Sequence, residues 1–215
     1  MSAAFFFRDY WSYYIELENE FIDTIKYVEL CSDNYKTYSV EYLKLLQAIC
    51  SEIDTIGKRI AVSFNPNFTI DRNTNIKKWG YEVQKIFTDI QGRSVCLKRP
   101  RYELVPFKNW KYTIKTKKNN SKQICLDGNS KSLFWWSDYN FVKHARTSFD
   151  DSGTLNFSKA NLKNVVYSLS ALYLLERLYL EKQYNISSFP EGSPLSPPES
   201  KLFCLFGDII DSNIT

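Results

Sequence analysis

The 215-residue sequence contains a single histidine, His144, and this scarcity limits the acid–base chemistry that the chain can perform. Imidazole is the only side chain whose unperturbed pKa lies near neutral pH, so His144 is the first candidate for proton transfer. The five cysteines form no CxxC pair and have no histidine at zinc spacing. The sequence therefore predicts reduced thiols, no metal and no cofactor.

Long apolar segments are also missing. No run of about 18 apolar residues could cross a bilayer, and no basic segment precedes the short apolar run that starts at Phe5. We therefore expect no membrane partner, no secretory signal and a cytoplasmic location. Hydrophobic residues make up 44% of the chain and charged residues 24%, which is typical of a globular domain with a sizeable core.

Apolar residues recur at helical spacing over most of the first 185 residues, so the predicted fold class is mainly α, with a helical bundle over residues 1–185. Serine residues ahead of two of the apolar stripes are good N-caps. The expected helices cover residues 5–30, a second span that follows Ser39, residues 76–90, a span from Ser132 or Ser137 to Phe149, and a last span from a Ser158 cap to Tyr184.

The periodicity changes between residues 98 and 131. Residues 110–116 alternate at period two, residues 118–121 have turn composition, and residues 123–126 can return as a second strand. We expect a small β-hairpin or ordered loop around residues 100–128, inserted between helices of the bundle.

This insertion is strongly basic. Nine basic residues and one acidic residue lie between Lys98 and Lys122, whereas the whole chain carries a net charge of only +4. Cations interleaved with aromatic residues are typical of a surface that binds single-stranded RNA. A solvated hairpin has the same composition, and Trp110 and Phe107 could instead anchor the insertion to the core. The RNA-binding candidates are Arg99, Arg101, Lys108, Trp110, Lys111, Lys115, Lys117 and Lys118.

Four of the seven prolines lie between residues 186 and 200, together with serine and glycine, which predicts a linker. The segment that follows, residues 201–215, is too apolar for a solvated tail. We expect it to dock on the bundle or on a partner subunit.

Polar residues gather around His144 on one predicted helix. Asn140 lies one turn before it and shares its face, while Lys143 and Arg146 lie beside that face. An imidazole with cations that hold a phosphate suits metal-independent RNA cleavage. Because one imidazole cannot easily transfer both protons, a homodimer that juxtaposes two copies of His144 would complete the site. Alternatively, His144 forms a hydrogen bond within the bundle and the cations are solvated or paired with carboxylates.

Glu52 is a further candidate, because it lies among isoleucines in the middle of the second predicted helix. A carboxylate at that position could orient His144 or Arg146 across the bundle. The alternative is an exposed Glu52 next to an ordinary ion pair between Asp54 and Lys58, which lie four residues apart.

Two long early helices, and a polar segment with histidine ahead of a long last helix, resemble the HEPN superfamily. That family carries an arginine four to six residues before its histidine. Here only the histidine has a counterpart, His144, since Arg146 follows it. The resemblance implies a helical bundle and a homodimeric ribonuclease or toxin of bacterial abortive-infection defence against phage. The alternative is a non-catalytic helical dimer that binds a phage or host protein as sensor or inhibitor.

Overall fold

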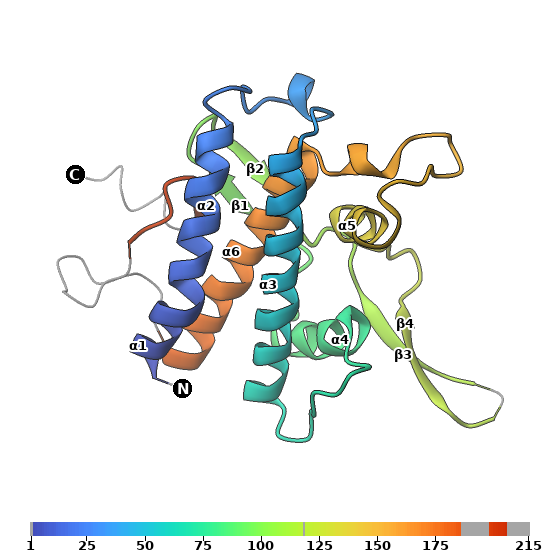
Figure 1. Cartoon of the computed structure of the whole chain (residues 1–215). Helices are drawn as coiled ribbons and strands as arrows, with labels where there is room; N and C mark the ends of the chain where they lie inside the picture. The colour runs from blue at the N-terminus through green and yellow to red at the C-terminus, as the bar shows by residue number, and fades with distance from the viewer. Residues whose placement is uncertain (1, 118, 186–197, 206–215) are drawn as a thin grey trace.

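The computed structural model describes residues 2–117, 119–185 and 198–205, and its fold is mainly α. Helices α2, α3 and α6 form the body, with α4, α5 and the hairpin β3–β4 on one side of α3 (Figure 1). The helices are α1 (Ala3–Phe6), a π turn (Phe7–Trp11), α2 (Ser12–Thr24), α3 (Val40–Phe64), α4 (Ile76–Ile86), α5 (Phe134–Ala145) and α6 (Leu162–Tyr184), with 3-10 turns at Ser32–Asn34 and Asn156–Lys159. The strands are β1 (Val95–Leu97), β2 (Tyr102–Leu104), β3 (Tyr112–Thr116), β4 (Lys122–Leu126) and β5 (Phe203–Leu205).

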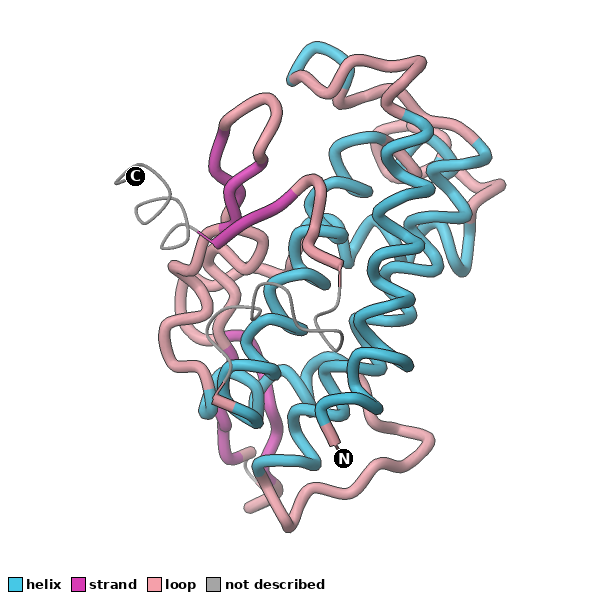
Figure 2. Tube along the Cα trace, turned by 90° about the vertical axis from the view of Figure 1, so that its left-hand side faces the viewer, coloured by secondary structure: helices cyan, strands magenta, loops and turns pink. Residues whose placement is uncertain are grey.

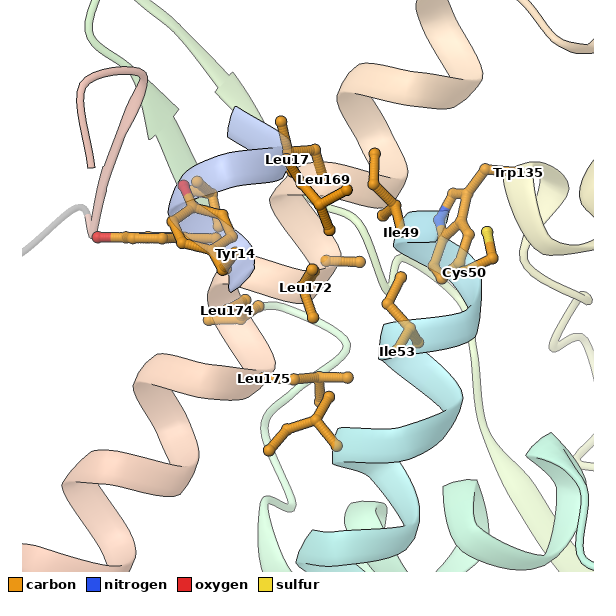
Figure 3. Packing of buried hydrophobic residues seen from close by; sticks show 14 of the residues in the cluster. Tyr14, Leu17, Ile49, Cys50, Ile53, Trp135, Leu169, Leu172, Leu174 and Leu175 are labelled. Atoms are coloured by element: carbon orange, nitrogen blue, oxygen red, sulfur yellow. The ribbon is translucent and has the colours of Figure 1, made fainter. Parts of the chain in front are cut away.

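Helix α6 is the centre of the core, since 17 of its 23 residues are buried. A helix that is buried on all sides needs neighbours all round, and α6 contacts α2, α3, α5 and β5. On one side Leu172 packs toward Ile49 and Ile53 of α3, and on another side Tyr14 of α2 lies near Leu174 (Figure 3). The fold is therefore organised around the last predicted helix.

Some helix boundaries follow local capping chemistry, whereas α5 begins at Phe134 without a side-chain cap, rather than at Ser132 or Ser137. The predicted N-cap at Ser39 is confirmed, because its hydroxyl accepts a hydrogen bond from the Tyr42 amide at 3.1 Å. The predicted Ser158 cap is wrong: Ser158 lies in a 3-10 turn, and Asn161 caps α6 by accepting from the Asn164 amide at 3.1 Å. The predicted end at Tyr184 is confirmed.

Three other helices end earlier than the apolar pattern indicates, at Thr24, Ile86 and Ala145. The apolar residues that follow, such as Leu30 and Ile90, are buried, but they lie in turns rather than in helices. Periodicity therefore reported burial correctly but could not tell a helix from a buried turn.

The strands form two separate sheets (Figure 2). The predicted hairpin is confirmed as β3 and β4, which pair from Tyr112 opposite Leu126 to Thr116 opposite Lys122. The second sheet has the order β2–β1–β5 and is antiparallel throughout. Sequence reasoning missed this sheet, because its strands have three residues each and β5 lies about a hundred residues after β1 along the chain.

Buried Glu18 of α2 ties the C-terminal segment to the bundle. Its carboxylate accepts hydrogen bonds from the Tyr14 hydroxyl at 2.6 Å, from the Ser200 hydroxyl, and from the amides of Lys201 and Leu202 at 2.8 and 3.2 Å. Residues 202–205 of the predicted docking segment thus lie on their own bundle. Most of the predicted linker (186–197) and the end of the tail (206–215) lie outside the described residues.

None of the helices in the described part of the chain is long and apolar enough to cross a membrane. In the same part, no group of three or more histidine, cysteine, aspartate or glutamate side chains could hold a metal ion.

The close packing of α3 against α4 generates a stability prediction. A Cβ atom added at Gly57 would lie 2.6 Å from Cε3 of buried Trp79, and the indole has no room to move. We expect Gly57→Ala to lower the free energy of unfolding by about 1–3 kcal/mol, as measured by urea denaturation.

Gly92→Ala is the matched control, because the nearest atom to its added Cβ would be the Asp89 carbonyl oxygen at 3.7 Å. We expect little change or a slight gain in stability there. Equal effects of the two substitutions would contradict this packing of α3 against α4.

Candidate functional site

Helix α5 positions the residues around His144. Its inner face is buried through Trp135, Tyr139 and Val142, and the Trp135 indole donates a hydrogen bond to the Pro106 carbonyl at 3.0 Å. Because these residues lie at helical spacing, α5 is fixed in rotation and its opposite face is turned to solvent. His144 lies on that outer face and is exposed.

The outer face carries an aromatic stripe. Phe134, Phe141 and His144 lie at positions i, i+7 and i+10, so their side chains follow one line along the helix. The two phenylalanines are 39% and 46% exposed, and Phe149, just beyond the helix, is 68% exposed. We call the residues Phe134, Phe141 and His144 the α5 stripe. Exposed aromatic residues gathered on one helix face are unusual for a surface without a partner.

Cations surround the α5 stripe. The Lys163 ammonium lies 4.8 Å from the Phe134 ring centroid, and the Lys159 ammonium lies 5.2 Å from that of Phe141. On the other flank, Lys143 lies 5.5 Å from the ring of Tyr139. These distances are in the range of cation–π attraction, which holds the lysines beside the rings.

The predicted partners of His144 do not converge on it. Within the described part of the chain, no hydrogen bond or ion pair involves the side chains of His144 or Arg146, and both are exposed. Asn140 donates its side-chain amide to the Trp136 carbonyl of its own helix at 3.0 Å. A single chain therefore offers an exposed imidazole among cations rather than an assembled acid–base pair.

The segment after α5 is held by an ionic cluster. Lys159 donates to Asp150 at 2.7 Å and lies 3.9 Å from Asp138, which accepts a hydrogen bond from Asn164 at 2.8 Å. The ammonium of Lys159, together with the Ser152 hydroxyl, holds the pKa of Asp150 well below its usual range. These interactions hold the segment that follows α5, which includes Phe149, against the helix.

Glu52 does not lie on the side of α3 that faces α5. Asp54, on that side, accepts a hydrogen bond from the Trp79 indole at 2.8 Å and pairs with Lys58, as the alternative interpretation expected. Glu52 instead acts electrostatically on Tyr13 of α2 and on Glu176 of α6. Its predicted role of orienting His144 or Arg146 is therefore not supported, because the groups that Glu52 acts on belong to α2 and α6, whereas His144 and Arg146 are exposed at the end of α5.

Sequence reasoning missed Glu176, a fully buried carboxyl group on the central helix. Neither of its oxygens has a hydrogen-bond partner among the described residues. Burial, and then the charge of Glu52, raise the pKa of Glu176 well above its usual range. Burial also raises the pKa of Glu52, to about 7. The sequence signal that could have identified Glu176 is an acidic residue inside the apolar part of the last predicted helix.

The basic residues of the insertion form two groups rather than one patch. Arg99 and Arg101 lie at the turn between β1 and β2, whereas Lys115 and Lys117 lie on the hairpin β3–β4 (Figure 1). Lys108 is exposed in the intervening loop, Lys111 pairs with Asp127 at 3.3 Å, and Lys118 lies outside the described residues.

Trp110 requires a correction, because it is fully buried and is not part of any RNA-binding surface. Its ring packs against Phe107 and Trp79, at centroid distances of 5.1 and 5.9 Å, and covers Gly80. Trp110 therefore anchors the insertion to the core, as the alternative interpretation expected.

A separate groove of about 550 Å³ lies between the end of α2 and the start of α3. Its lining includes Thr24, Val28, Leu45 and buried Tyr42, whose hydroxyl has no hydrogen-bond partner among the described residues. No predicted site residue lines this groove, and none of its lining residues belongs to α5.

Comparison of the chain with models of known protein families, with curated proteins and with solved structures finds no match.

The pKa of Glu52 generates a prediction for the pH dependence of stability. Because folding raises this pKa from 4.5 to about 7, the folded state binds the proton more tightly than the unfolded state does. The resulting stabilisation is complete below pH 4.5 and is lost as the pH rises through 7. We expect Glu52→Gln to flatten this decline in the free energy of unfolding, measured by urea denaturation at pH values across that window.

Glu16→Gln is the control, because Glu16 is exposed on α2 and should leave the pH profile unchanged. A Glu52→Gln profile that matched that of the unmodified protein would show that Glu52 is not desolvated.

Proposed function

We propose that this chain binds single-stranded RNA through the α5 stripe and its flanking cations and, as a homodimer, cleaves the RNA with His144. The observation that carries the proposal is the exposed line of Phe134, Phe141 and His144. Bases stack on exposed aromatic rings with little sequence preference, and each such contact is worth about 1–3 kcal/mol.

The charges next to the α5 stripe favour RNA over an uncharged partner. Lys143 and Lys163 lie against aromatic rings, and Arg146 extends from the end of the helix, whereas Lys159 is held by Asp150. Ammonium and guanidinium groups at these positions can follow a phosphate backbone while bases stack on the rings. Arg146 also presents a planar fork that suits a phosphate.

The cleavage step rests on His144. A 2′-hydroxyl must lose a proton, and the leaving 5′-oxygen must gain one, so two positioned groups are needed. One chain supplies a single imidazole without a hydrogen-bond partner among the described residues. A second copy related by a two-fold axis would bring a second His144, with Lys143 and Arg146 stabilising the charge on phosphorus.

The resemblance to the HEPN superfamily supports the same proposal from another direction. It adds a HEPN-like bundle, a cytoplasmic location and host or phage RNA as the target, within bacterial abortive-infection defence. The second proposal is a non-catalytic dimer that binds a phage or host protein. The exposed rings of Phe141 and Phe149 favour it, since aromatic side chains dominate protein interfaces as well.

Two substitutions on one helix face separate binding from cleavage. We expect Phe141→Ala to weaken the binding of a single-stranded RNA oligonucleotide by about tenfold to a hundredfold, because one stacking contact is lost. We expect His144→Ala to abolish cleavage while weakening binding by no more than Phe141→Ala does. Binding is measured by fluorescence anisotropy at several salt concentrations, and cleavage by electrophoresis of the same RNA in the presence of a metal chelator.

Lys117→Ala on the hairpin is the matched control, since it removes one exposed cation away from α5 and should weaken binding only slightly. Unchanged affinity in Phe141→Ala would contradict the RNA surface. Binding without any cleavage by the unmodified protein would contradict the catalytic role of His144. The second proposal would be favoured if every variant that no longer binds RNA still bound a defined protein partner.

A further inference from the structure

Two cysteines face each other across the sheet that holds the C-terminal segment. In the antiparallel pairing of β1 with β5, Cys96 lies directly opposite Cys204. Directly opposed side chains in such a pair extend to the same face of the sheet. The Cys204 sulfur lies 3.7 Å from the Cys96 carbonyl oxygen, so it already sits over the backbone of its neighbour.

The Cα spacing of this pair lies within the range of a disulfide. The Lys98 amide donates to the Leu202 carbonyl at 2.8 Å, and the opposed pair two residues further along is of the same hydrogen-bonded type. Opposed Cα atoms of that type lie about 5.5 Å apart. A disulfide accepts Cα separations of roughly 4.4–6.8 Å but needs its Cβ atoms about 3.5–4.5 Å apart, closer than the roughly 5.5 Å of this type of pair. The bond can therefore form in the observed register, under strain that makes it readily reducible.

The two thiols differ in access, which sets the order of their reactions. Cys96 is only 7% exposed, whereas Cys204 is partly exposed. A small-molecule disulfide can therefore reach Cys204 first, and Cys96 is then the nearest thiol that can resolve the adduct.

We propose that Cys96 and Cys204 form a reversible disulfide that locks β5 onto β1. The oxidant is a low-molecular-weight disulfide such as oxidised glutathione. The Cys204 thiolate attacks one of its sulfurs and releases one glutathione thiol; the Cys96 thiolate then attacks the Cys204 sulfur and releases the second. The two protein thiols thus lose two protons and two electrons, which the oxidant takes up as two glutathione thiols.

The disulfide would reinforce the non-covalent attachment of the same segment. Glu18 already holds Ser200, Lys201 and Leu202 against α2, and Lys98 donates to the Ser200 carbonyl at 2.7 Å. A covalent bond between Cys96 and Cys204 would turn this attachment into a closed loop of the chain that contains α5 and α6. The C-terminal segment is therefore a modification site that responds to the thiol–disulfide balance.

The test is oxidation of the full chain with oxidised glutathione, followed by alkylation, proteolysis and mass spectrometry. We expect one linked pair of peptides, which joins Cys96 to Cys204 and disappears after treatment with dithiothreitol. Closure of a loop of about a hundred residues should also raise Tm by about 10 °C relative to the reduced protein.

Matched variants keep the result specific. A variant with serine at Cys31, Cys50 and Cys125 should form the same linked pair, and Cys96→Ser should accumulate a glutathione adduct on Cys204. Circular dichroism of each reduced variant confirms that it is folded. A native protein that keeps glutathione on Cys204, that links either cysteine to another position, or that remains fully reduced would overturn the proposal.

Discussion

Burial of α6 on all sides is the constraint on which the rest of the structure depends. The helix cannot be covered by α2 and α3 alone, so α5 and β5 must also pack on it. Because Trp135 and Tyr139 fill the inner side of α5, Phe134, Phe141 and His144 are left outside. The candidate RNA surface is thus a consequence of core packing, since the residues that fix the rotation of α5 also determine what it presents to solvent.

Two buried glutamates on neighbouring helices differ in the hydrogen bonds that their carboxyl groups form. Glu18 accepts hydrogen bonds from hydroxyl and amide groups and so joins distant parts of the chain. Glu176 has no such partner among the described residues, and burial raises its pKa well above the usual range. Hydrogen bonding makes the first a structural link, whereas the second costs stability unless it is protonated.

The sequence allowed prediction of the elements that depend on local chemistry. The cap at Ser39, the hairpin β3–β4 and the end of α6 at Tyr184 all follow from nearby residues. The pairing of β1 with β5 depends on contacts between residues about a hundred positions apart, which no local pattern encodes. For the same reason the surroundings of Glu52 and the buried position of Trp110 were each left as one of two alternatives.

The central claim is that the outer face of α5 contacts RNA, and photo-cross-linking tests it most directly. A single-stranded RNA with photoreactive uridines is irradiated with the full chain, and the modified peptides are mapped by mass spectrometry. The account predicts cross-links within residues 134–149, on the α5 stripe and Phe149. Cross-links confined to the hairpin β3–β4 or to the turn between β1 and β2 would contradict it.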